Sequence, residues 1–265
     1  LLFMAFVLSS FLSYLRYRGE EGPGRKRAWY LLTFFLFLLA LLSKVAAVVL
    51  PLLFLLYEFC FPRVKGRELI KGKIPFFLLS ALFSLITVWI YRHHDDPVGF
   101  HGGAPYYSAL AMANVFVEYL IYLAVPLHLD HYYRTRIPAS LGEPQVLLSL
   151  AAIFLFALLA WRSYRGKRIF LFWSGWWVIS LLPVLNIVPI AILRADRYMY
   201  LAGLGFFYFL ARGLVAARRI QPKPAGMSIF LAGTLLACGA YVSLTRDRNQ
   251  LWGDYVSLWE DNLKK

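Results

Sequence analysis

Long runs of apolar residues, separated by short basic clusters, dominate this chain. Two of the clearest runs extend from Ile74 to Tyr91 and from Met227 to Leu244. Each has about the length that an α-helix needs to cross roughly 30 Å of hydrocarbon. A helix in a soluble core is seldom apolar on every face over such a length. The pattern therefore predicts an all-α integral membrane protein.

About eight membrane-crossing helices are expected from these runs. The stretch from Ala28 to Cys60 is too long for one helix and has basic clusters at both ends, so we interpret it as a hairpin that turns at Ser43 and Lys44. The predicted crossings are residues 1–15, 28–43, 45–60, 74–91, 145–161, 169–186, 198–216 and 227–245.

One apolar stretch, Ala111 to Leu127, is not counted as a crossing. It contains Glu118, and counting it would reverse the side of every later loop. We expect an interfacial or re-entrant helix there, within a long outer segment from Arg92 to Pro144. Such a segment usually shapes a site.

The end of the chain has a different pattern, because apolar and charged residues alternate with helical spacing after Arg246. We divide the chain into a polytopic membrane domain, residues 1–245, and an amphipathic junction helix, residues 246–265. The chain opens inside an apolar run, so we expect that the membrane domain is truncated at its N-terminus and belongs to a longer protein.

Charge sets the predicted orientation of the helices. The net charge is +14, from 28 Lys and Arg against 14 Asp and Glu. The basic residues lie in clusters between apolar runs and form no single patch, which argues against nucleic-acid binding. In the predicted topology 18 of them fall in inner loops and 10 in outer segments, as the positive-inside rule requires. Most acidic residues then gather on the outer face.

Several kinds of site are excluded by the residue types present. Cys60 and Cys238 lie in or beside apolar runs, where we expect small buried apolar side chains, and their spacing forms neither a disulfide framework nor a zinc site. No phosphate-binding loop, dinucleotide fingerprint, metalloprotease motif or nucleophile elbow is present. No metal site is predicted, and the catalytic residues are unknown.

The sharpest polar signal is RADRYMYL, from Arg194 to Leu201, at the outer mouth of a crossing. Arginine can hold a phosphate bidentately, so this cluster suits an anionic headgroup. The alternative is an interfacial belt that anchors the helix in lipid. Lys44, at the hairpin tip, either faces a lipid phosphate or is a turn residue that snorkels to the headgroups. The candidate headgroup ligands are Lys44, Arg194, Asp196, Arg197, Tyr198 and Tyr200.

A second group of polar residues lies in the long outer segment. Adjacent residues of the HHDD run, His93 to Asp96, point in different directions, so a solvated loop is the favoured interpretation. The later LHLDHYY run is a better candidate for acid–base work, with an amphipathic interfacial strip as the alternative. Glu118 is expected to pair with a basic neighbour or to face an aqueous cavity, and Glu58 to pair with a loop Lys or Arg. The possible outer-site residues are Glu118, His128, Asp130 and His131.

Three segments resemble one family. Leu42 to Lys44 (LSK), before a run with Pro51 that ends in LLYEFCFPR, is similar to a segment of multi-pass GT-C glycosyltransferases, the branch of the transmembrane and tetratricopeptide-repeat O-mannosyltransferases and their bacterial relatives. RADRYMYLAGLGF resembles the same family's ADRYxYLPxxGL segment. RNQLWGDYVSLWEDNLKK resembles its junction with the repeats. Val45 and Ala202 replace prolines that are common in the family.

The resemblance implies a polyprenyl-phosphate-linked sugar as the donor and a protein or glycan acceptor on the extracytoplasmic face. Lys44 and the Arg194, Asp196 and Arg197 cluster would bind the donor phosphate or headgroup. The family's acidic catalytic loop lies nearer the N-terminus than this chain reaches, so the chain alone is expected to be inactive. A need for a divalent metal stays undefined. The short loops and strong charge bias indicate a bacterial inner membrane.

Two other functions stay open at this stage. An O-antigen ligase or polymerase-like enzyme would also use outer Arg and His residues on a lipid-linked glycan. A transporter or scaffold would be non-enzymatic, but the chain has no related halves and few ionisable residues at mid-membrane.

Overall fold

The protein is all-α. A computed structural model describes residues 1–62, 68–93, 99–125, 130, 133–164, 166, 168–220, 223–251 and 253, and no strand occurs among them. The α-helices are α1 (Leu2–Gly19), α2 (Pro23–Ser43), α3 (Leu50–Cys60), α4 (Glu68–Lys71), α5 (Ile74–Arg92), α6 (Pro105–Ala124), α7 (Pro144–Ser163), α8 (Arg168–Leu181), α9 (Met199–Ile220) and α10 (Lys223–Leu251). Short 3₁₀ helices are η1 (Val45–Val49), η2 (His101–Gly103), η3 (Leu182–Val184) and η4 (Asp196–Tyr198).

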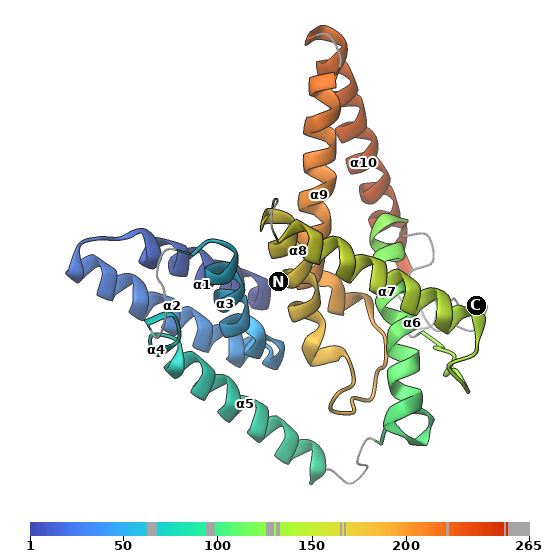
Figure 1. Cartoon of the computed structure of the whole chain (residues 1–265), viewed down its shortest axis with the longest axis horizontal. Coiled ribbons are helices and arrows are strands. Elements are labelled where there is room, and N and C mark those ends of the chain that lie inside the picture. The colour runs from blue at the N-terminus through green and yellow to red at the C-terminus, as the bar shows by residue number, and fades with distance from the viewer. Residues whose placement is uncertain are drawn as a thin grey trace.

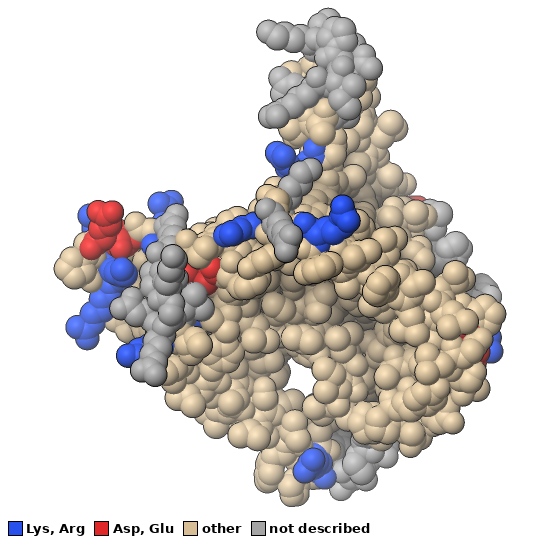
Figure 2. Space-filling view, viewed as in Figure 1, with Lys and Arg blue, Asp and Glu red and all other residues tan. Residues whose placement is uncertain are grey.

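The predicted membrane character is confirmed. In the described part of the chain, six helical segments are long and apolar enough to cross a membrane, namely Pro23–Ser43, Ile74–Arg92, Pro105–Ala124, Pro144–Ser163, Asp196–Ala216 and Met227–Asp247. Their outer surfaces are apolar, and the charged groups visible in Figure 2 are separated by a wide uncharged surface. The apolar window of α10 buries none of its residues, which suits contact with lipid.

The structure does not confirm the predicted number of eight crossings. Each predicted crossing corresponds to a helix, but Val45–Cys60 and Arg168–Val184 are shorter than a full span. α1, which corresponds to the crossing predicted over residues 1–15, is not among the six segments that are long and apolar enough to cross. The stretch that was expected to be an interfacial or re-entrant helix largely coincides with the 20-residue helix α6, which is long and apolar enough to cross a membrane. Glu118 does not interrupt this apolar helix, because its carboxylate forms an ion pair with Arg194.

Three smaller expectations change as well. The helical stretch predicted over 169–186 ends its α-helix at Leu181, where Pro183 follows within η3. α10 continues past residue 245 without a break, so no end of a helix marks the predicted domain boundary, and residues 254–265 lie outside the described chain. Cys60 is buried as predicted, but the prediction for Cys238 was wrong because it is exposed on α10.

Aromatic side chains pack the first helices together. α1, α2, α3 and α5 form one group, while α9 and α10 make a hairpin that projects from the body (Figure 1). The Phe54 ring stacks on Tyr14, with ring centroids 4.2 Å apart, and meets the edge of Phe76 at 5.5 Å. Trp176 of α8 joins this core through Phe11, and its indole N–H donates to the carbonyl of Leu201 at 2.8 Å. That bond fixes α8 against α9.

A buried carboxylate links the ends of three helical segments. Glu58 of α3 is 1% exposed and accepts a hydrogen bond from the Tyr14 hydroxyl at 2.5 Å. Arg18 of α1 pairs with it, Nε to Oε1, at 2.5 Å, and Lys73, which precedes α5, lies 3.8 Å from the same oxygen. We call Glu58, Tyr14, Arg18 and Lys73 the Glu58 cluster. The predicted pairing of Glu58 with basic residues is confirmed.

Replacing this carboxylate should weaken the fold. Glu58→Gln keeps the shape but leaves Arg18 and Lys73 buried beside a neutral amide, so we expect a loss of about 3–5 kcal/mol in the free energy of unfolding. Unfolding of the purified protein in neutral detergent measures it. Glu20→Gln is the control, because Glu20 pairs at 3.5 Å with Arg25, which is 81% exposed, and such a pair contributes about 0–1 kcal/mol. Equal losses in the two variants would contradict this assignment.

Candidate functional site

The loop between η3 and η4 carries Arg194 and leads directly into Asp196, and side chains from distant segments hold it. Asn186 adopts φ 54°, in the left-handed region that Asn tolerates better than most residues, and its side-chain oxygen accepts from the backbone N–H of Ile190 at 3.2 Å. The His101 ring donates to the carbonyl of Ile190 at 2.9 Å. The Tyr119 hydroxyl of α6 accepts from the N–H of Ala195 at 3.2 Å. These contacts supply hydrogen-bond partners to backbone N–H and C=O groups of a segment that has no regular secondary structure.

Arg194 is enclosed by one carboxylate and two aromatic rings. Its guanidinium pairs with Glu118 of α6, which confirms that Glu118 has a basic neighbour. The guanidinium carbon lies 4.0 Å from the ring centroid of Tyr133 and 5.4 Å from that of Tyr122, within cation–π range. We call Arg194, Glu118, Tyr122 and Tyr133 the arginine cage. Because Glu118 balances the charge of Arg194, the cage holds the loop against α6 and offers no free cation.

Asp196 extends this network toward the outer segment. Its carboxylate accepts from the Tyr133 hydroxyl at 2.5 Å, and that hydroxyl accepts from the backbone N–H of Asp130 at 3.0 Å. Burial, together with the Asp196 carboxylate, raises the pKa of Tyr133 above its ordinary value. The phenol therefore stays protonated and remains a donor to Asp196 at physiological pH.

Lys44 lies in a different environment, at the tip of the hairpin between α2 and η1. Its ammonium nitrogen is 5.8 Å from the ring centroids of both Phe3 and Tyr198. Burial lowers the pKa of Lys44, and the positive charge of Arg197 lowers it further. Among the residues that the structure describes, no carboxylate forms an ion pair with Lys44 or Arg197. Two neighbouring cations thus lack a counter-ion.

These two cations line a small pocket, which we call the cation pocket. Its cavity volume is about 20 Å³, roughly enough for one water molecule. Aromatic and aliphatic side chains form most of its wall. The lining residues are Phe3, Lys44, Ala46, Ser180, Val184, Arg197, Tyr198 and Leu201. Apolar walls with two uncompensated positive charges suit the anionic group of an amphiphilic molecule, such as a lipid phosphate.

The predicted ligands therefore separate into two groups. Lys44, Arg197 and Tyr198 meet in the cation pocket, whereas Arg194 and Asp196 belong to the network of Glu118 and Asp130. Tyr200 is 66% exposed in the first turn of α9 and does not line the pocket. His128 and His131 lie outside the described residues. Arg197 lies within η4, whereas Arg194 lies in the loop that precedes it.

Sequence reasoning missed the partners that complete both groups. Tyr133 lies in the LHLDHYY run, in which only the His and Asp residues were predicted to belong to a site. For Tyr122, the sequence offered only its position in the same apolar stretch as Glu118, and this did not predict a contact with Arg194. Phe3 and Ser180 are ordinary residues in apolar runs, and only the packing of α1 and α8 beside η1 and η4 brings them to Lys44.

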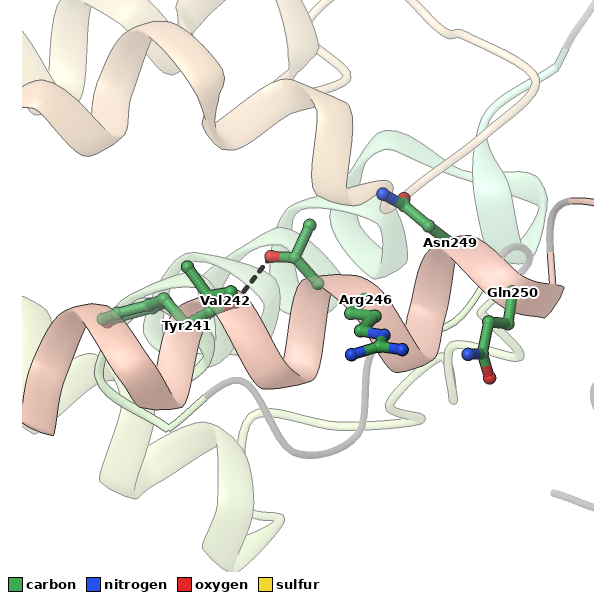
Figure 3. A pocket seen from close by; sticks show the side chains of 6 residues that line it. Tyr241, Val242, Arg246, Asn249 and Gln250 are labelled. Atoms are coloured by element: carbon green, nitrogen blue, oxygen red, sulfur yellow. Dashed lines mark hydrogen bonds between the residues drawn. The ribbon is translucent and has the colours of Figure 1, made fainter.

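The other hollows among the described residues with a known lining are not lined by the predicted residues. A larger one runs along α10 and is lined by Tyr241, Val242, Thr245, Arg246, Asn249 and Gln250 (Figure 3). Its Thr245 hydroxyl donates to the carbonyl of Tyr241 at 2.6 Å, so it is already satisfied. Within the described ranges, no group of three or more His, Cys, Asp and Glu could hold a metal ion. The cation pocket is therefore the candidate site.

The uncompensated charge of Lys44 should cost stability. A lysine with a lowered pKa destabilises the folded state in full at pH values below that lowered pKa, and the cost disappears as pH rises from the lowered pKa to the ordinary pKa of 10.5. Lys44→Met should therefore raise the melting temperature in neutral detergent at pH 7, by an amount that shrinks as pH rises toward 10.5. The exposed Lys71, changed to Met, is the control. A lower melting temperature for Lys44→Met would indicate a hidden anionic partner.

Comparisons with family models, curated proteins and solved structures found no match to this chain. The resemblance of its three segments to glycosyltransferases thus has no independent support from a whole-chain similarity. A function for the protein must rest on its residues and on their arrangement.

Proposed function

We propose that the chain is the membrane part of a glycosyltransferase that takes a sugar from a polyprenyl-phosphate-linked donor. The observation that carries this proposal is the pair of uncompensated cations, Lys44 and Arg197, in a pocket with apolar walls. A partly buried cation such as Lys44, without an ion-pair partner among the described residues, is costly and is often functional in a membrane protein. A phosphate on an isoprenoid chain would supply both the charge and the apolar part.

The residues of the pocket also belong to the segments that resemble GT-C enzymes. Lys44 ends the LSK segment, and Arg197 and Tyr198 lie within RADRYMYL. These two segments are far apart in sequence, so their meeting at one pocket is not a consequence of chain proximity. This supports a shared role in binding the donor phosphate. Arg194 and Asp196 act indirectly in this proposal, by fixing the loop that carries Arg197.

The chemistry would be substitution at the anomeric carbon of the sugar. The bond from that carbon to the phosphate oxygen breaks, the acceptor hydroxyl oxygen bonds to the carbon, and the lipid phosphate leaves. Lys44 and Arg197 would stabilise the negative charge that develops on the departing phosphate. An acidic group that receives the proton of the hydroxyl would come from outside this pocket. We place the site on the extracytoplasmic face of a bacterial inner membrane, with a protein hydroxyl as acceptor.

Transfer of label from a donor tests the proposal. The complete gene product is expressed in membranes and given radiolabelled polyprenyl-phosphate sugars. Lys44→Ala should reduce transfer about 100-fold or more, which is the usual effect of removing one group that stabilises the transition state. Arg197→Ala should reduce it about tenfold or more, because Arg197 is exposed and its charge is screened by solvent. Arg134→Ala is the matched control, because Arg134 is an exposed outer-segment cation away from the pocket.

The outcomes separate the candidate functions. Wild-type transfer in both pocket variants would contradict phosphate binding by these cations. Transfer from a lipid-linked oligosaccharide, but not from a single-sugar donor, would favour a ligase-like enzyme. No transfer from any donor, with normal expression, would favour a transporter or scaffold.

A further inference from the structure

Ser180 is a buried hydroxyl without a partner at the edge of the cation pocket. It lies in the last turn of α8 and is 6% exposed. Its side-chain oxygen makes no hydrogen bond, yet Ser180 lines the pocket together with Lys44 and Arg197. Buried polar groups are nearly always paired, so an unpaired one beside two cations needs an explanation.

Most described hydroxyls of the apolar helices are paired, whereas Ser108 and Ser174, like Ser180, are buried without a partner, and only Ser180 of these three lines the cation pocket. Serine and threonine in a helix commonly donate to the carbonyl four residues earlier, which removes the cost of burial. That bond is present, at 2.6–2.8 Å, for Thr33, Ser43, Thr87, Thr234 and Thr245. Ser180 has no such bond. Its hydroxyl is therefore available to a ligand that enters the pocket.

The two cations of the pocket and its unpaired hydroxyl differ in exposure. Arg197 is exposed, Lys44 is partly buried and Ser180 is buried. The cavity of about 20 Å³ admits one atom the size of a water oxygen. A bound phosphate would thus place a single oxygen inside and keep its other substituents on the side of Arg197.

We infer that the Ser180 hydroxyl donates a hydrogen bond to a non-bridging oxygen of the phosphate that Lys44 and Arg197 bind. This inference rests on the proposed function, because it needs a phosphate in the cation pocket. It identifies the ligand as a phosphate ester with at least one free oxygen, whose chain and sugar leave the pocket outward. Ser180 is a binding and positioning residue, and the bond from Trp176 to Leu201 holds its helix in place.

Direct binding tests the inference. The probe is farnesyl phosphate, with farnesol as the ligand that lacks a phosphate, added to the complete protein in lipid nanodiscs. Loss of one charge-assisted hydrogen bond should weaken binding of farnesyl phosphate to Ser180→Ala roughly tenfold or more, and leave farnesol unaffected. Ser174→Ala is the matched control, because Ser174 is also buried and unpaired on α8 but does not line the pocket.

Thermal melting separates binding from packing. Removing an unpaired buried hydroxyl should leave the melting temperature of the ligand-free protein unchanged or raise it, and should reduce the rise that farnesyl phosphate causes. A lower ligand-free melting temperature in Ser180→Ala would mean a structural role and would overturn the inference.

The binding results distinguish the inference from the proposed function. If farnesyl phosphate binds Ser180→Ala as it binds the wild type but binds Lys44→Ala more weakly, the inference about Ser180 is overturned and the proposed function stands. Unchanged binding in both variants would reject the phosphate site itself.

Discussion

The ion pairs of Glu58 are the constraint on which the first half of the structure depends. A carboxylate buried to this degree is stable only if its charge and lone pairs are met, and here Tyr14 and Arg18 of α1 and Lys73 before α5 meet them. Because the partners come from separate segments, the helices can adopt only the relative positions that keep all of these contacts. The aromatic stack around Phe54 then fills the space beside the cluster. Lys44, at the opposite end of α2, gains its position from this arrangement.

The same principle recurs, in a more open form, between α6 and the loop that precedes η4. Glu118 balances Arg194, and Tyr133 joins the pair to Asp196, so the loop before α9 is fixed by polar contacts instead of regular structure. The two arginines of this short stretch therefore have different environments. Arg194 is paired with Glu118, whereas Arg197, one turn later, has no carboxylate partner among the described residues and lies beside Lys44. A positive charge is thereby left where an anion can reach it.

Much of the fold could be predicted from the sequence, because apolar runs of membrane length specify helices with little help from tertiary contacts. The expected pairing of Glu58 and of Glu118 also followed from the cost of a lone buried charge. The path of residues 185–195 could not be predicted, since it depends on hydrogen bonds from His101 and Tyr119, far away in the sequence. The positions of Ser180 and Phe3 in the cation pocket could not be predicted either, because they depend on which helices pack together. The periodicity of apolar residues does not contain this information.

The composition of the cation pocket has a consequence for how the protein is made. Phe3 leaves the ribosome first, Lys44 follows in the second helical segment, and Arg197, Tyr198 and Leu201 come only with α9. During insertion the early helices must therefore sit in the bilayer with Lys44 exposed to lipid headgroups, and the pocket closes around it only when α9 docks through the bond from Trp176 to Leu201. Assembly of the pocket is thus a late event in biogenesis, and a chain halted before η4 would be embedded in the membrane without Arg197, Tyr198 and Leu201 of the pocket wall.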